Sequence, residues 1–260
     1  MGKRKIIGYY IHLRRKTSEV NKLKIAIFSD VHGNFMALEA VLQDIERRKA
    51  DLVFCAGDLV GMGVFPNDVI RTIRERHIPT ILGNYDEAVG YYLADGGISD
   101  ADSQLAKMGR WALAWTKQQV IPENKAFLRG LLSRIKLKLY NKNILIVHGS
   151  PARNTEYYGE AYPEASIKRV MELESTDILI CGHTHIPAFK RIGKKYFINA
   201  GSIGYPKDGD SRAAYVLVNV TEEIVETEII KVEYDLERTL AAMELAGLPQ
   251  ELTLALRKAE

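Results

Sequence analysis

Short hydrophobic runs recur along the chain, and glycine or polar residues follow each of them. Apolar runs of this length, bounded by turn-forming residues, predict buried β-strands. Five such runs lie at Lys24 to Phe28, Leu52 to Ala56, Pro79 to Leu82, Ile144 to Val147 and Ile178 to Cys181. We therefore expect a strand in each of these segments.

A helical pattern follows the first run. Its apolar stripe consists of Phe35, Leu38, Leu42 and Ile45, and Asn34 stands where an N-cap residue is expected. Further helical patterns lie near residues 67–76 and 164–174. Strands that alternate with helices in this way predict a largely parallel sheet.

A second group of segments predicts antiparallel strands. Residues 135–139 alternate leucine or isoleucine with lysine, and residues 188–192 turn at Gly193 into residues 196–199. Together, residues 213–220 and 224–230 predict a hairpin. The chain is thus expected to combine parallel and antiparallel pairing in an α/β fold.

The remaining segments are mainly helical in pattern. We expect a helical insertion near residues 85–132, in which Trp111 and Trp115 are four residues apart and fill the core. The C-terminus predicts two helices interrupted at Gly247 and Pro249. A chain of 260 residues suits one large domain, which we expect to span residues 23–260.

The positive charge is concentrated at the N-terminus. Residues 1–22 hold seven of the 36 basic residues and one of the 33 acidic ones, so the rest of the chain is slightly acidic. We expect this basic extension to be disordered, and one hypothesis is that the native chain starts at Val20 or Leu23. The slightly acidic body argues against a nucleic-acid partner.

Composition indicates a cytoplasmic protein. No apolar run approaches the roughly 20 residues that span a bilayer, and the first residues lack the apolar stretch of a secretory signal. The two cysteines, Cys55 and Cys181, fall inside predicted strands and are expected to fill core space rather than to bind metal. A homo-oligomer is left open.

Polar side chains follow all five predicted buried strands. These side chains are Asp30 and His32, then Asp58, then Asn84, Tyr85 and Asp86, then His148, and finally His183 and His185. The carboxyl ends of parallel strands meet at one edge of a sheet, so we expect these groups to converge. Clustered imidazoles and carboxylates are costly to bury without a cation between them.

The donor set predicts two metal ions. Imidazole, carboxylate and amide donors without thiolate suit Mn²⁺, Fe²⁺, Zn²⁺, Co²⁺ or Ni²⁺, and we expect Mn²⁺ foremost. The seven donors are Asp30, His32, Asp58, Asn84, His148, His183 and His185, more than one tetrahedral ion takes. Asp58 lies in the middle of their order and is the natural bridging carboxylate.

The chain resembles the calcineurin-like metallophosphoesterases. The resemblance rests on Asp30-Val31-His32, Gly57-Asp58, Gly83-Asn84, His148 and Gly182-His183-Thr184-His185, which follow the family's order between about residues 24 and 220. The short spacing from Asp30 to Asp58, the Gly-Asn-Tyr-Asp segment and residues 199–204 further resemble the compact prokaryotic branch that includes small phosphodiesterases.

This resemblance implies a four-layer α-β-β-α sandwich of two mixed sheets and a dinuclear centre. Asp30, His32, Asp58 and His185 would hold one metal, and Asn84, His148, His183 and the shared Asp58 the other. A water held between such ions can attack a phosphate ester. The candidate catalytic residues are Asp30, Asp58, Asn84, Tyr85 and Asp86, and the candidate substrate contacts are Asn84 and Arg153.

Tyr85 departs from the family pattern. Much of the family has a histidine there, thought to help protonate the leaving group, and a phenol with a pKa near 10 is a poorly matched acid at neutral pH. We therefore expect better turnover of phosphodiesters or related small phosphate esters than of alkyl monoesters. The alternatives are a protein phosphatase, a dinucleoside polyphosphate hydrolase, a nuclease, and a non-enzymatic scaffold like the retromer subunit of this fold.

Overall fold

The computed structural model describes residues 22–97 and 104–260. Apart from Lys22, the predicted basic extension lies outside the described residues. The nine strands found there are β1 (Leu23–Phe28), β2 (Leu52–Cys55), β3 (Ile135–Leu139), β4 (Lys142–Ile146), β5 (Ile178–Cys181), β6 (Pro187–Ile192), β7 (Lys195–Ala200), β8 (Ala213–Val220) and β9 (Val225–Val232). The eight helices are α1 (Phe35–Arg47), α2 (Pro66–Glu75), α3 (Asn84–Gly90), α4 (Gln104–Gln119), α5 (Pro122–Arg129), α6 (Glu164–Leu173), α7 (Leu236–Leu245) and α8 (Gln250–Lys258).

The strands form two mixed sheets. One has the order β2-β1-β8-β9 and the other β3-β4-β5-β7-β6. Pairing is parallel between β1 and β2 and along β4, β5 and β7, whereas the remaining neighbours are antiparallel. The predicted hairpins β6–β7 and β8–β9 are confirmed.

The alternation of strands and helices predicts a largely parallel sheet. This prediction is wrong, because the buried runs are divided between two mixed sheets. The predicted strand at Pro79–Leu82 is also wrong. This segment forms isolated bridges, in which Thr80 pairs with Cys55 and Ile81 with Leu132. A proline at its first position removes a ladder donor, and the run is too short to extend the pairing.

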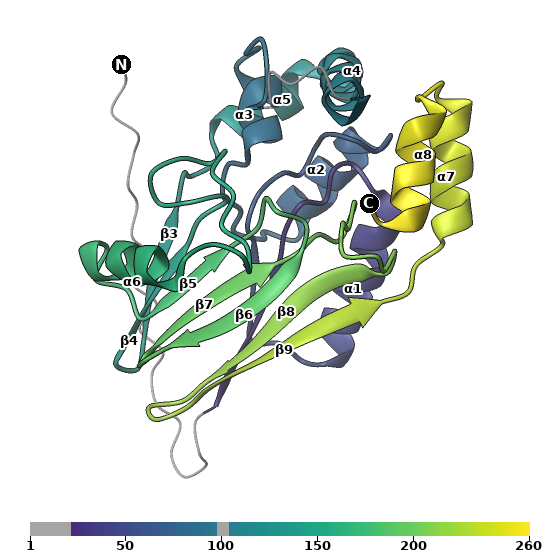
Figure 1. Ribbon diagram of the computed structural model, residues 1–260. Helices are drawn as coiled ribbons and strands as arrows, with labels where there is room; N and C mark the ends of the chain where they lie inside the picture. The colour runs from purple at the N-terminus through teal and green to yellow at the C-terminus, as the bar shows by residue number, and fades with distance from the viewer. Residues whose placement is uncertain (1–21, 98–103) are drawn as a thin grey trace.

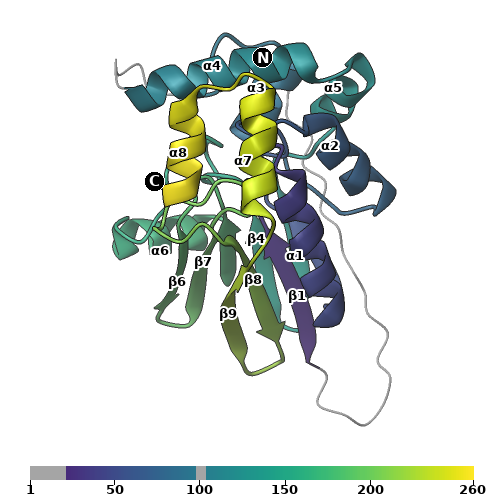
Figure 2. The same cartoon turned by 90° about the vertical axis from the view of Figure 1, so that its right-hand side faces the viewer.

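Three hydrophobic clusters separate four layers, which confirms the predicted sandwich. Along β1, Ile25 and Ile27 point between the two sheets, whereas Ala26 and Phe28 point outward beneath the helices. A third cluster packs α6 on the outer face of the five-stranded sheet. The view in Figure 2 shows the order of the layers, with α6 and α1 on opposite sides of the strands.

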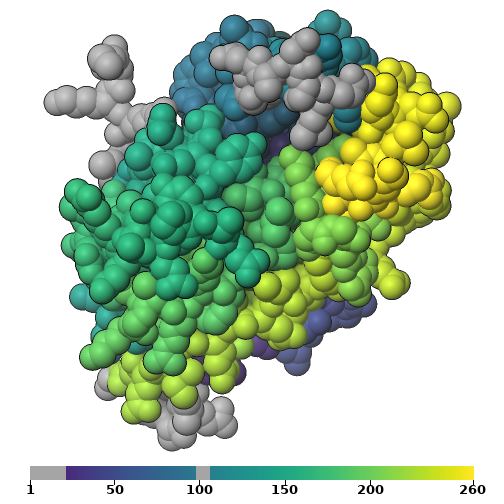
Figure 3. Space-filling view, in the orientation of Figure 1, coloured from purple at the N-terminus to yellow at the C-terminus, as the bar shows by residue number. Residues whose placement is uncertain are grey.

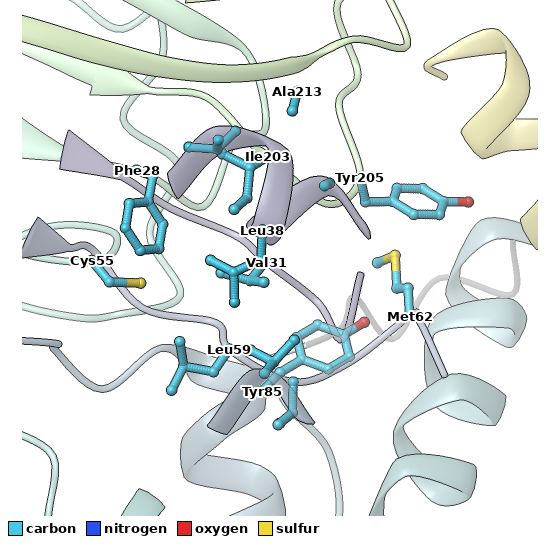
Figure 4. Packing of buried hydrophobic residues seen from close by; sticks show 14 of the residues in the cluster. Phe28, Val31, Leu38, Cys55, Leu59, Met62, Tyr85, Ile203, Tyr205 and Ala213 are labelled. Carbon is cyan, nitrogen blue, oxygen red and sulfur yellow. The ribbon is translucent and has the colours of Figure 1, made fainter. Parts of the chain in front are cut away.

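Helix α1 forms as its sequence predicts. The Asn34 side chain accepts a hydrogen bond from the Ala37 N–H at 3.1 Å and so caps the first turn. Its apolar stripe packs on the four-stranded sheet, where Figure 4 shows Leu38 near Phe28 and Val31. Cys55 belongs to this cluster and Cys181 to the cluster under α6, so both cysteines fill the core as expected.

Helices α3, α4 and α5 occupy the described part of the segment that the sequence predicts to be helical, and they lie above the sheets in Figure 1. Trp115 packs against the core, but Trp111 is 37 % exposed, so its assignment to the core is wrong. The two tryptophans are four residues apart, yet the second lies on the buried face of α4 and the first at its margin.

The C-terminal helices α7 and α8 lie side by side, and Gly247 (φ +74°) makes the turn between them. The space-filling view in Figure 3 shows this pair beside the upper helices. Among the described helices, none is both long and apolar enough to cross a membrane.

Candidate metal centre

The seven predicted donor side chains converge from five segments of the chain. They lie after β1, after β2, at the start of α3, after β4 and after β5. All seven are buried, and His183, the most accessible of them, is 5 % exposed. Six of them form two groups whose ligand atoms lie within 4.8 Å of one another: Asp30, His32 and His185 in one, and Asp58, His148 and His183 in the other.

The two carboxylate oxygens of Asp30 have different surroundings: one bonds to the backbone and the other faces the candidate metal site. Oδ2 accepts a hydrogen bond from the His183 N–H at 2.9 Å. Oδ1 is buried and has no hydrogen-bond partner among the described residues, although His185 Nε2 lies 3.2 Å away. Burial alone would raise the pKa of Asp30, but the neighbouring histidines lower it well below its usual value, so this carboxylate is ionised.

Asp58 lies between the two groups. Its Oδ1 accepts a hydrogen bond from the Tyr85 N–H at 2.9 Å, which leaves Oδ2 directed at the histidines. Oδ2 lies 3.4 Å from His148 Nε2 in one group and 3.7 Å from His32 Nε2 in the other. This position suits a carboxylate shared by two cations.

The rings of His32 and His185 both turn a lone pair toward the centre. His32 Nδ1 lies 3.2 Å from the Val60 carbonyl oxygen, and His185 Nδ1 donates to the Tyr205 carbonyl oxygen. A carbonyl oxygen accepts hydrogen bonds and donates none, so each Nδ1 carries the proton and each neutral ring has its lone pair on Nε2. The two Nε2 atoms are nevertheless 3.0 Å apart. A shared cation would remove their repulsion.

Asn84 and His148 make a similar contact. The His148 Nδ1–H donates to the Ala56 carbonyl oxygen at 2.8 Å, and the Asn84 Nδ2–H donates to the Gly96 carbonyl oxygen at 2.5 Å. Asn84 Oδ1 therefore faces His148 Nε2 at 2.8 Å. Burial opposes a charge on His148, but the two aspartates raise its pKa to about 10, so a proton occupies this contact until a cation replaces it.

His183 contributes an unpaired nitrogen. Its Nε2 is buried and has no hydrogen-bond partner among the described residues. Burial and the nearby His148 lower the pKa of His183 to about 3, so the ring is neutral and its lone pair is available. Together with Asp30 Oδ1, this nitrogen is a buried polar atom that a metal ion would satisfy, and the residues present therefore fit the expected ions.

The backbone at this centre adopts a conformation that side chains disfavour. Asp30, His32, Asp58, His183 and His185 all have φ between +47° and +66°. Each such residue costs about 1–3 kcal/mol and persists where surrounding contacts impose it. Backbone bonds supply those contacts here: the Asp30 N–H donates to the Gly57 carbonyl oxygen and the His32 N–H to that of Asp58, both at 2.9 Å.

Asp86 supports the loops beneath the centre. Its Oδ1 accepts hydrogen bonds from the Leu59 and Val60 N–H groups at 2.9 and 3.2 Å, and its Oδ2 accepts one from the Gly83 N–H at 3.2 Å. Burial and the charge of Asp58 raise the pKa of Asp86 to about 7. Its carboxylate thus joins the loop that carries Asp58 to the start of α3.

A cavity with about 730 Å³ of empty space, part of it open to solvent, borders the two groups. Asp58, Asn84, His183 and His185 form part of its wall. Tyr85 lines it as well, and its ring meets that of His32 edge to face, with centroids 5.1 Å apart. Burial and the charge of Asp58 raise the pKa of the Tyr85 phenol above its usual value.

Arg153 does not join this arrangement. Its side chain is exposed and is not among the residues that line the cavity. Its backbone carbonyl instead accepts a hydrogen bond from the Ser150 N–H at 2.8 Å, which closes the loop after β4. From the same loop, Tyr157 reaches the cavity and tilts over His183 at 4.3 Å between ring centroids.

Sequence reasoning missed several apolar residues of the cavity wall, namely Met62, Met108, Tyr205 and Leu252. A local signal existed for Met62, which is flanked by two glycines. Gly61 has φ +149°, and a Cβ there would collide with the His32 ring. The other three residues belong to helices or loops far away in sequence and have no motif that marks them.

The fold and the paired groups agree with the family comparison. Residues 23–223 match the model of the calcineurin-like phosphoesterase superfamily domain, so the chain belongs to that superfamily. The uncharacterized protein MJ0912 of Methanocaldococcus jannaschii is 32 % identical over 246 residues, which cover 89 % of this chain and 96 % of that protein.

Two further relatives carry functional descriptions. The phosphodiesterase YfcE of Escherichia coli K12 is 24 % identical over 199 residues, covering 76 % of this chain and 88 % of YfcE. The crystal structure of a metallophosphoesterase from Sphaerobacter thermophilus superposes with a TM-score of 0.73 at 30 % identity, covering 92 % of this chain and all of that one. The chain is thus similar to a phosphodiesterase in sequence and to a metallophosphoesterase in structure.

Proposed function

We propose that the protein hydrolyses phosphodiesters or related small phosphate esters at a dinuclear metal centre. The observation that carries this proposal is the pair of adjacent groups of buried ligand atoms, above all His32 Nε2 and His185 Nε2, which face each other at 3.0 Å. Two lone pairs held this close in a buried site repel each other, and a bound cation would relieve that repulsion. The membership of the phosphoesterase superfamily supplies the reaction class.

In this proposal Asp30, His32 and His185 hold one ion, and Asn84, His148 and His183 hold the other, with Asp58 between them. The arrangement is supported by the position of Asp58 Oδ2, within 3.7 Å of a ring nitrogen of each group. The nitrogen and oxygen donors suit Mn²⁺, Fe²⁺, Zn²⁺, Co²⁺ or Ni²⁺.

Two bound ions would supply a water of lowered pKa and polarise the phosphoryl oxygens. The two carboxylates leave such a centre with a net positive charge, which attracts the phosphate. In the reaction, water adds to phosphorus, the bond to the leaving oxygen breaks, and that oxygen takes up a proton. A diester thus gives a monoester and an alcohol.

The residues of the chain orient this reaction. Asn84 is held by the Gly96 carbonyl oxygen, so its amide oxygen keeps a fixed direction. Tyr85 lines the cavity beside the metal groups, but its pKa is raised by burial, which makes it a weak acid. Weak protonation of the leaving group favours diesters and aryl esters, whose leaving groups need little help.

The test is hydrolysis by protein freed of metal and then reconstituted with each candidate ion. We expect turnover of an aryl phosphodiester to exceed that of an alkyl monoester, and Asp58→Asn to lower it at least about a hundredfold. Asp68→Asn, which neutralises a half-buried carboxylate on α2 that pairs with Arg71, is the matched control and should keep wild-type turnover. Turnover that is equal in Asp58→Asn and wild type would reject the proposal.

A further inference from the structure

The cavity beside the metal groups has an apolar half. Six side chains line it: Met62, Tyr85, Met108, Tyr157, Tyr205 and Leu252. Five of the six are at most 7 % exposed, whereas Tyr157 is 58 % exposed at the rim. A ligand that covers the apolar surface which these side chains turn toward the cavity gains free energy.

These side chains come from widely separated parts of the chain. Met62 follows β2, Tyr205 follows β7, Met108 belongs to α4 and Leu252 to α8. Figure 4 shows Met62 next to the rings of Tyr85 and Tyr205. The Tyr205 hydroxyl donates to the Leu252 carbonyl oxygen at 2.9 Å, which fixes the ring against α8. The wall is therefore built by tertiary contacts that hold its shape.

The chemistry of this wall favours a planar aromatic group over an alkyl chain. Three of the six residues are tyrosines and two are methionines, and both kinds make favourable contacts with aromatic rings. Tyr157 tilts over the His183 ring with an interplanar angle of 36°, so an aromatic surface runs from the metal group to the rim. A ring that enters from the rim meets aromatic and sulfur contacts along this path.

Lys207 supplies a positive charge at the same cavity. Its backbone N–H donates to the His185 carbonyl oxygen at 3.2 Å, which places the residue beside the metal group. Within residues 22–97 and 104–260, no hydrogen bond or ion pair reaches its ammonium group. A partly buried cation of this kind suits an anionic ligand.

We propose that the substrate is an anionic phosphodiester whose non-leaving substituent is a planar aromatic group, which lies in the apolar half of the cavity while its phosphate lies between the metal groups and Lys207. This proposal rests on three features of one cavity: a wall of aromatic and sulfur-containing side chains, the unpaired ammonium group of Lys207, and the two groups of candidate metal ligands. This inference rests on the proposed function and narrows its substrate class.

The experiment compares two diesters that release the same leaving group. Phenyl p-nitrophenyl phosphate and methyl p-nitrophenyl phosphate both give p-nitrophenol, so they differ in the substituent that stays on phosphorus. The ratio of their kcat/KM values, divided by the ratio of their hydroxide-catalysed rates, measures recognition of the ring. We expect the phenyl ester to be preferred by about tenfold or more, as burial of one ring against apolar side chains predicts.

Two variants test whether this cavity causes the preference. Tyr157→Ala removes the exposed ring at the rim, where truncation is tolerated, and Met108→Gln replaces a buried thioether by a polar group of similar length. Both should lower the preference at least about threefold. Phe189→Ala removes an exposed ring of β6 that does not line the cavity and should leave the preference unchanged. Melting temperatures check that each variant is folded.

Binding provides a readout that does not need turnover. Phenylphosphonate and methylphosphonate carry the same anionic group, and calorimetry on metal-loaded protein should give the phenyl compound the tighter binding. Equal binding of the two, equal corrected kcat/KM values, or a preference that both cavity variants retain would overturn the inference while the proposed function stands. If neither diester is hydrolysed, the proposed function fails, and the two phosphonates alone decide whether the cavity holds an aromatic ring.

Discussion

His32 and His185 point their Nε2 atoms at each other across 3.0 Å, although each ring already uses its Nδ1 to bind a backbone carbonyl. Neither ring can turn its lone pair away without losing that bond. Burial and the nearby Lys207 lower the pKa of His185 to about 4, so the His185 ring itself is neutral near neutral pH. When both rings are neutral, the lone pairs that face each other repel and destabilise the metal-free fold.

Metal binding should accordingly stabilise the fold. With free metal at a hundredfold excess over its dissociation constant, the free energy of unfolding should rise by about 2.7 kcal/mol per site, and the melting temperature with it. Calorimetry with and without a chelator measures this rise. His185→Gln should lose most of it, because it removes a donor. A wild-type melting temperature that chelation does not change would contradict the expectation.

Tyr85→His should increase hydrolysis of alkyl monoesters. An imidazole whose pKa lies near neutrality protonates a leaving alkoxide better than this buried phenol does, so we expect kcat/KM for the monoester to rise about tenfold or more. Turnover of an aryl diester should change little, since its leaving group needs no proton. Tyr85→Phe is the control, because it keeps the ring and cannot transfer a proton. A wild-type protein that hydrolyses alkyl monoesters as well as aryl diesters would refute the role given to Tyr85.

Asp86→Asn should lower both the stability of the protein and its affinity for metal. The carboxylate accepts three backbone hydrogen bonds with its two oxygens, and an amide can accept with one oxygen only. We expect a loss of about 1–3 kcal/mol in the free energy of unfolding and a roughly tenfold to hundredfold loss of metal affinity. Denaturant unfolding and metal titration measure the two effects. Asp68→Asn, which removes a half-buried carboxylate on α2, should leave the metal affinity unchanged. An Asp86→Asn protein with wild-type metal affinity would show that Asp86 has no supporting role.

Arg153→Ala tests whether the Arg153 side chain contacts the substrate. The sequence suggests that Arg153 pairs with a phosphate, but the side chain is exposed and does not line the cavity. We therefore expect kcat/KM for an aryl diester to stay within about threefold of wild type, as is usual for a surface substitution. A loss of a hundredfold would restore Arg153 as a substrate contact.

The sequence predicts the convergence of the candidate donor residues better than it predicts the sheets. Asp58 and His148 are visible because each directly follows a buried strand, and this local pattern does not depend on which sheet the strand joins. Strand pairing is a long-range property, so the division of β1 and β4 between two sheets could not be derived from the alternation of elements. The family resemblance, and not the periodicity, supplied the four layers.

The residues of the cavity wall cannot be predicted from local sequence patterns either, because their contacts are also long-range. Tyr205 and Leu252 meet only because α8 packs over the loop after β7, and neither residue belongs to a repeating or conspicuous motif. For Arg153, closeness in sequence to His148 suggests a substrate contact, but the side chain is exposed and does not line the cavity, because the loop bonds between Ser150 and the Arg153 carbonyl oxygen turn the chain there. Sequence proximity to a donor is thus weak evidence for a place in the site.

The central claim is that two cations bind side by side in this centre. Elemental analysis of purified protein, saturated with Mn²⁺ or Zn²⁺ and then freed of unbound metal, measures it directly. We predict two ions per chain in the wild type and fewer in Asp58→Asn, because Asp58 Oδ2 lies near both groups. A wild-type protein that binds no more than one ion under saturating conditions would contradict the account.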